Sequence, residues 1–80
     1  MKYTVYTIQS QVDRRIYVGF SSDVEKRLKE HNSGKTKSTK GFRPWITIFT
    51  EECMDRMAAI EKEKYYKTGI GKEKLKNKVS

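Results

Sequence analysis

Five side chains of this sequence could act together on a phosphate ester: Tyr6, Tyr17, Arg27, His31 and Glu63. A tyrosine or a histidine can orient or deprotonate a water molecule, and an arginine stabilises the charge that develops on phosphate oxygens. A glutamate can hold a divalent cation. These residue types together meet the requirements of phosphodiester hydrolysis, provided that the fold brings them to one place.

Two strands carry the tyrosines. Residues 3–8 alternate between two faces and are rich in β-branched and aromatic side chains, and residues 16–20 alternate in the same way after a short polar stretch. This pattern predicts a β-hairpin. The predicted core-facing side chains are Tyr3, Val5, Ile16, Val18 and Phe20.

Tyr6 and Tyr17 are an odd number of residues apart, so an even-length connection places them on the same face of the hairpin. A two-residue turn at Gln11-Val12 would place them directly opposite each other. Gly19 shares this face, and a glycine within a strand often marks the close approach of a ligand or another backbone. An ordinary cross-strand tyrosine pair is the alternative interpretation.

Arg27 and His31 lie one turn apart on a predicted helix. Ser22 and Glu25 form a capping-box pattern at its start, and residues 32–34, Asn-Ser-Gly, predict its end. Both side chains could also be merely solvated or structural.

Glu63 belongs to a second predicted helix, from about Met54 to Thr68 and ending at Gly69. The helical period places Glu63 in an inward stripe, so its carboxylate must be paired, neutralised or bound to a metal. Arg27 is the expected ion-pair partner, and a cation is the alternative. The other members of the stripe are Ala59, Ile60, Tyr66 and Ile70.

Residues 35–43 predict an exposed basic loop, because they contain Lys35, Lys37, Lys40 and Arg43 and no acidic residue. A third strand follows Pro44, with Trp45, Thr47 and Phe49 alternating with Ile46 and Ile48 as in a strand covered on both faces. Residues 72–77 predict a short lysine-rich turn or helix. The order β-β-α-β-α-α indicates an α+β fold, in which helices flank a three-stranded, mostly antiparallel sheet.

Composition narrows the class of protein. Eighty residues, of which 35% are hydrophobic, predict one domain over residues 1–80, and the net charge of +8 favours nucleic acid as partner. The single Cys53 excludes an intramolecular disulfide, lacks the neighbours of a zinc site and favours a cytoplasmic setting. No apolar run approaches the roughly 18 residues of a membrane span, so no membrane association is expected.

The sequence resembles the small single-domain members of the GIY-YIG nuclease family. Residues 4–6, Thr-Val-Tyr, and 17–19, Tyr-Val-Gly, match its two motifs, and residues 22–34 match its arginine-bearing helix. Residues 39–45 resemble its loop and third strand, and residues 59–64 resemble its glutamate segment. The resemblance covers nearly the whole chain and implies a divalent-metal-dependent endonuclease that acts on DNA, including branched or damaged DNA, in repair or recombination.

The resemblance also implies the roles of the five residues. Tyr6 would be a general base or orient the attacking water, with His31 in its network, and Tyr17 would assist and contact the scissile phosphate. Arg27 would stabilise the transition state, and Glu63 would hold one Mg²⁺ or Mn²⁺. Asn77 lies near the position of a family asparagine.

The chain departs from the family pattern at Thr4, which replaces the first glycine. We expect no separate recognition domain beside the predicted basic loop, so the protein would recognise DNA by charge and shape. We expect it to act as a monomer or weak dimer. A catalytically inactive nucleic-acid-binding module is the alternative function, and a lysine-rich protein-interaction domain is a third.

Overall fold

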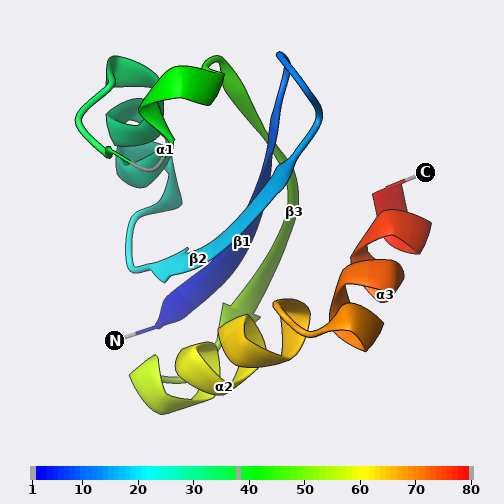
Figure 1. Cartoon of the computed structure of the whole chain (residues 1–80). Helices are drawn as coiled ribbons and strands as arrows, with labels where there is room; N and C mark the ends of the chain where they lie inside the picture. Colours follow the sequence, from blue (N-terminus) through cyan, green and yellow to red (C-terminus); the bar gives the residue numbers. More distant parts are fainter. Residues whose placement is uncertain (1, 38, 80) are drawn as a thin grey trace.

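The computed structural model describes the backbone of residues 2–37 and 39–79, with side chains through residue 75. Within these residues the elements follow the predicted order and confirm the α+β class (Figure 1). They are β1 (Tyr3–Ser10), β2 (Ile16–Ser21), α1 (Val24–Ser33), the 3-10 turn η1 (Lys40–Phe42), β3 (Trp45–Cys53), α2 (Arg56–Tyr66) and α3 (Gly69–Val79). None of the described helices is long and apolar enough to cross a membrane.

The strands form one antiparallel sheet in the order β2-β1-β3, with β1 in the centre. Tyr6 pairs with Gly19, and Tyr17 pairs with Ile8. The tyrosines therefore share one face as predicted, but they lie diagonally. The connection through residues 11–14 is longer than a two-residue turn, because the Ser10 amide donates to the Arg15 carbonyl at 2.9 Å.

Helices lie on both sides of the sheet (Figure 1). On one side, α2 and α3 cover the core made by Val5, Val18, Cys53, Ala59, Tyr66 and Leu75, and the predicted inward residues of the hairpin pack there. On the other side, α1 and the chain after it cover Tyr6, Ile8 and Trp45, with Tyr17, Val24, Leu28 and Phe42 packed around them. The two motif tyrosines thus belong to the α1 side.

The third strand follows its prediction in covering but not in regularity. Helix α1 contacts β3 on one face and α2 and α3 contact it on the other, although β3 is an edge strand and its Ile46 is 46% exposed. Thr7 pairs with Phe49, whereas Ile8 pairs with Thr47, so Ile48 is the extra residue of a β-bulge. The bulge sends Phe49 into the α2 core, while Trp45 stays on the α1 side.

The start of α1 is capped by Asp23 and not by Ser22, because the Asp23 carboxylate accepts from the Lys26 amide at 3.1 Å. An anionic cap also interacts favourably with the positive end of the helix dipole. At the other end Gly34 adopts the left-handed conformation, with φ of 86°, and confirms the predicted stop.

The second predicted helix is too long, because α2 begins after the Asp55 cap and ends at Tyr66. Gly69 opens α3 and does not terminate α2, so the predicted short element at residues 72–77 is a longer helix. Ile70 is consequently 69% exposed and does not continue the inward stripe. The side chain of Asn77 lies outside the described residues.

Candidate active site

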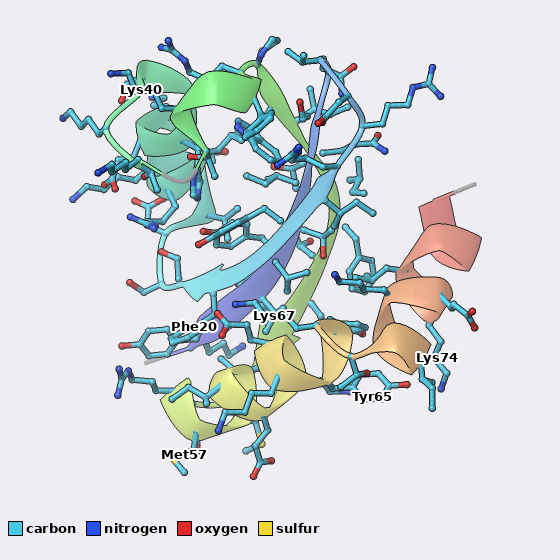
Figure 2. The ribbon with its side chains drawn as sticks, viewed as in Figure 1. Phe20, Lys40, Met57, Tyr65, Lys67 and Lys74 are labelled. Atoms are coloured by element: carbon cyan, nitrogen blue, oxygen red, sulfur yellow. The ribbon has the colours of Figure 1, made fainter. Side chains whose placement is uncertain are left out.

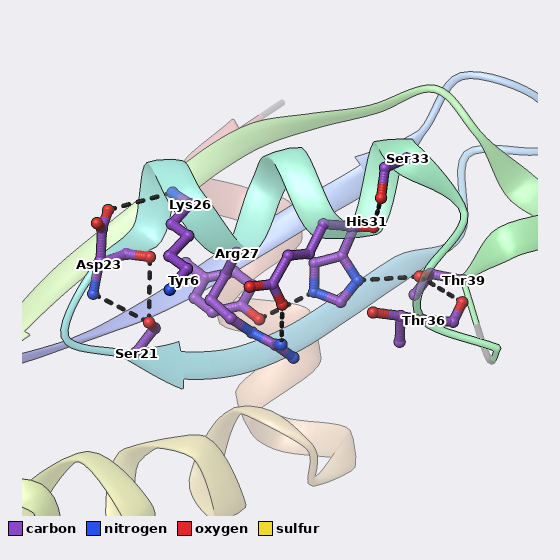
Figure 3. A network of polar contacts seen from close by, with 10 residues as sticks. Tyr6, Ser21, Asp23, Lys26, Arg27, His31, Ser33, Thr36 and Thr39 are labelled. Atoms are coloured by element: carbon purple, nitrogen blue, oxygen red, sulfur yellow. Dashed lines mark hydrogen bonds and ion pairs between the residues drawn. The ribbon is translucent and has the colours of Figure 1, made fainter.

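A buried polar chain links the centre of the sheet to the loop after α1. Tyr6 and His31 are almost completely buried, and the Tyr6 hydroxyl lies 3.0 Å from His31 Nε2 (Figure 3). His31 Nδ1 lies 2.9 Å from the Thr39 hydroxyl, which donates to the Thr36 carbonyl at 3.3 Å. The helix spacing that places His31 one turn after Arg27 points its ring at β1.

Arg27 joins this chain from the exposed side of α1. Its side chain is 36% exposed and forms an ion pair with Glu30, with Nη1 2.7 Å from Oε2. A hydrogen bond with Tyr6 raises the pKa of Arg27 above its ordinary value, although burial opposes this rise. The predicted ion pair between Arg27 and Glu63 is not formed: Arg27 pairs with Glu30 on α1, and Glu63 pairs with Lys67, the residue that follows α2.

Gly19 makes room for the Tyr6 ring. A Cβ atom at Gly19 would lie 2.7 Å from the Tyr6 hydroxyl oxygen and 2.8 Å from its Cζ. The close approach that this glycine predicts is therefore that of a tyrosine. Tyr17 lies beside them and packs edge-on against His31, with ring centroids 5.0 Å apart, and against Trp45.

Both buried members of the chain are neutral at neutral pH. Burial is the largest cause of the raised pKa of Tyr6. Arg27 lowers this pKa, whereas the charges of Tyr17 and Glu63 raise it further. Burial and then the charge of Arg27 lower the pKa of His31, against a smaller opposing effect of Glu30. A desolvated group favours its uncharged form. Tyr6 is thus a phenol and His31 an uncharged imidazole.

Glu63 approaches from α2. Its side chain is 21% exposed and forms an ion pair with Lys67, with the oxygen 3.5 Å from Nζ, so the inward position predicted for Glu63 is confirmed. Its charge reaches Tyr6 and contributes to the raised pKa of that phenol. Four of the five predicted residues therefore lie together on the α1 side, whereas Glu63 belongs to α2, which packs on the other side of the sheet.

The described residues contain no group of three His, Cys, Asp or Glu side chains that could enclose a metal ion. Glu63 can offer one carboxylate, which suits Mg²⁺, because that ion keeps several waters and binds one or two carboxylates together with substrate phosphates. The donor set therefore fits a cation that is held jointly by Glu63 and a phosphate.

The basic loop is less exposed than predicted. Its four cationic side chains are open to solvent, and Lys40 extends from the α1 side of the molecule (Figure 2). Thr39, however, is 1% exposed, and its carbonyl accepts from Trp45 Nε1 at 2.9 Å. The middle of the loop is therefore anchored in the α1 core.

Sequence reasoning missed three residues of this region. Glu30 has a recognisable signal, because it lies three residues after Arg27 on a helix. Asn32 binds both backbone groups of Trp45, at 3.0 and 2.6 Å, and Thr39 binds His31. The contacts of Asn32 and Thr39 join segments that are separate in the sequence, so no local sequence pattern predicts them.

The fold and this arrangement of tyrosines, arginine and histidine define a small nuclease-type α+β domain. The family model described as the GIY-YIG catalytic domain matches residues 2–77, and the chain belongs to the GIY-YIG family. Its relatives are the small proteins named UPF0213.

A UPF0213 protein of Staphylococcus haemolyticus is 34% identical over 76 residues, which cover 94% of this chain and 92% of the relative. The UPF0213 protein YazA of Bacillus subtilis is 40% identical over 63 residues, 78% of this chain and 64% of YazA. The solution NMR structure of a UPF0213 protein from Bacillus halodurans matches with a TM-score of 0.59 and 31% identity. This structural match covers 96% of this chain and 84% of the Bacillus halodurans chain.

Proposed function

We propose that this protein is a divalent-metal-dependent endonuclease that hydrolyses DNA phosphodiester bonds with low sequence specificity, in repair or recombination. The observation that carries the proposal is the contact of Tyr6 with both Arg27 and His31, at positions that match the family's motifs. A tyrosine held between a donor and an acceptor is suited to handling a proton next to a charged oxyanion.

The roles follow from exposure and charge. Tyr17 and Arg27 are partly exposed, so they would contact the scissile phosphate, and Arg27 would stabilise the charge of the transition state. Tyr6 would orient the attacking water or accept its proton. Glu63 would hold Mg²⁺ or Mn²⁺, a cation that polarises the phosphate and stabilises the leaving oxygen.

The attacking water must be able to reach the Tyr6 hydroxyl, yet Tyr6 is only 1% exposed. Arg27 is its partner on the solvent side and is itself held by Glu30. We expect Arg27 to leave Glu30 for the DNA phosphate, because a phosphate accepts two parallel hydrogen bonds from a guanidinium. That movement would uncover the Tyr6 hydroxyl only when the substrate is present.

DNA would be held mainly by its backbone. The exposed cations of the basic loop contact phosphates irrespective of sequence, so we expect recognition by charge and shape, with branched or damaged DNA as candidate substrates. We also propose that residues 1–80 act as one cytoplasmic domain, as a monomer or weak dimer, and that a single site nicks before it cuts both strands.

Incubation of purified protein with supercoiled plasmid and a branched oligonucleotide, with Mg²⁺, Mn²⁺ or EDTA, tests this proposal. Glu63→Gln should abolish metal-dependent nicking and keep DNA binding, because it removes one anionic ligand and preserves the side-chain shape. Glu61→Gln is the matched control, because Glu61 is an exposed residue of the same helix. Equal nicking by Glu63→Gln and wild type would refute the proposed role.

The burial of Tyr6 favours one other function, a nucleic-acid-binding module without catalysis. This alternative predicts salt-sensitive binding and no metal-dependent product. Lys40→Gln should lower the slope of log affinity against log salt by about 0.9, the value for one lost phosphate contact. Lys74→Gln on α3, far from Lys40 in Figure 2, should leave the slope unchanged. Cleavage lost in Glu63→Gln would exclude this alternative.

A further inference from the structure

The hydrogen bonds around His31 have a single consistent direction. The guanidinium of Arg27 lies near the Tyr6 hydroxyl and lowers its pKa, and an arginine offers no acceptor, so the proton of that hydroxyl needs another partner. The atom 3.0 Å away is His31 Nε2. Nε2 therefore carries a lone pair, and the single proton of a neutral imidazole lies on Nδ1.

The other end of the chain agrees with this assignment. Thr39 uses its hydroxyl proton toward the Thr36 carbonyl, so its oxygen is free to accept from His31 Nδ1, 2.9 Å away. Thr39 is almost completely buried, and Trp45 holds its carbonyl, so the hydroxyl stays in place. No water is needed to complete the chain from Tyr6 to Thr36.

We propose that Thr39 is a positioning residue that holds His31 in the Nδ1-protonated tautomer, so that His31 Nε2 accepts the Tyr6 proton. When Tyr6 gives up that proton and takes one from the attacking water, Nε2 becomes protonated and Nδ1 keeps its bond to Thr39. Thr39 acts through His31 and touches no reacting atom. This inference rests on the proposed function for its consequence in catalysis, but the tautomer itself does not.

The position of Thr39 has a second consequence. It lies inside the basic loop, between Lys37 and Lys40, which we expect to grip DNA. The loop that would bind phosphates and the chain that would activate water therefore share one residue. A displacement of the loop would remove the acceptor of the Nδ1 proton. His31 could then carry its proton on Nε2, the nitrogen that faces Tyr6.

His31 is the single histidine of the sequence, so the ¹⁵N signals of its ring can be assigned without ambiguity. In the full chain we expect a protonated Nδ1 and an unprotonated Nε2. Thr39→Val removes the acceptor and keeps the branched shape, and Thr39→Ala does so with less side chain. Either should shift the tautomer ratio about tenfold toward protonated Nε2, the equivalent of one hydrogen bond of about 1.4 kcal/mol. Thr39→Ser keeps a hydroxyl and should restore the wild-type ratio.

Thr47→Val is the matched control, because Thr47 is an exposed threonine of β3 that takes no part in this chain or in the basic loop. Cleavage of plasmid should fall about tenfold in Thr39→Val, with DNA binding unchanged, and should be normal in Thr39→Ser and Thr47→Val. A wild-type Nε2-protonated tautomer, or a ratio unmoved by Thr39→Val, overturns the inference. A shifted tautomer in a chain that never cleaves DNA supports the inference and refutes the proposed function.

Discussion

Replacing Gly19 with alanine tests whether the site depends on the room that this glycine leaves for Tyr6. The added Cβ would lie 2.7 Å from the Tyr6 oxygen, 2.8 Å from Cζ and 3.2 Å from a ring carbon of Tyr17, inside the 3.4 Å of ordinary contact. Tyr6 is 1% exposed and packs in the α1 core, so its ring cannot move freely. Gly19→Ala therefore forces overpacking and displaces the hydroxyl from His31.

The magnitude follows from these two effects. Overpacking of a core costs about 1–3 kcal/mol, and the lost hydrogen bond costs about 1 kcal/mol. The smaller conformational entropy of alanine in the unfolded chain returns about 0.4–1 kcal/mol. We expect a net loss of about 2–3 kcal/mol, and the melting temperature of a domain of this size should fall by about 10–20 °C.

Urea denaturation followed by the fluorescence of Trp45, the single tryptophan, measures the free energy of unfolding. Gly41→Ala is the control, because a Cβ there meets nothing within 4 Å. In a Tyr6→Phe background Gly19→Ala should cost less, since the nearest clashing atom is gone. A cost of Gly19→Ala within about 0.5 kcal/mol of Gly41→Ala would refute the close approach of Tyr6 to Gly19.

Three further outcomes are expected. Glu30→Gln frees Arg27 from its ion pair, so the affinity for DNA, measured by fluorescence anisotropy at low salt, should rise. The free energy of unfolding should change by no more than about 0.5 kcal/mol. Unchanged or weaker affinity would contradict this prediction. Tyr66 donates to Glu51 at 2.7 Å, and burial, assisted by this carboxylate, raises the pKa of Tyr66 to about 12. The stability from this raised pKa is complete below the unfolded value of 10.0 and is lost as the pH rises toward 12. The difference in free energy of unfolding between wild type and Tyr66→Phe, measured by urea denaturation, should therefore shrink across that range. A constant difference would count against this prediction. Asn32→Ala removes two hydrogen bonds to the start of β3 and should cost about 2–3 kcal/mol in the same assay, whereas a loss below about 0.5 kcal/mol would argue against the bridge.

The sequence predicted the hairpin and the shared face of its tyrosines correctly, because the alternation of a strand is a local property with a period of two. It also predicted the end of α1, since Gly34 takes a conformation that other residues rarely adopt. The inward position of Glu63 followed in the same way from the helical period. Each of these inferences depends on neighbours within one or two turns of the chain.

The errors occurred where a distant segment decides the outcome. The alternation from Trp45 to Phe49 suggested one continuous face, but pairing with β1 inserts a bulge at Ile48 and reverses the direction of Phe49. The partner of Glu63 was predicted to be Arg27, whereas helix neighbours at short range satisfy both charges. Which charges form a salt bridge depends on how close they lie in the folded protein. Spacing along the chain does not give that distance for residues on separate elements.

By itself, the sequence determined the α+β order of elements, the family motifs and the residue types able to handle a phosphate, because these are written in local pattern and composition. Only the tertiary structure decided which atoms meet. It placed Tyr6 against Gly19, turned His31 between Tyr6 and Thr39, and brought the middle of a basic loop into the core. Hydrogen bonds between segments depend on packing to within a fraction of an ångström, and no periodicity in the chain encodes that.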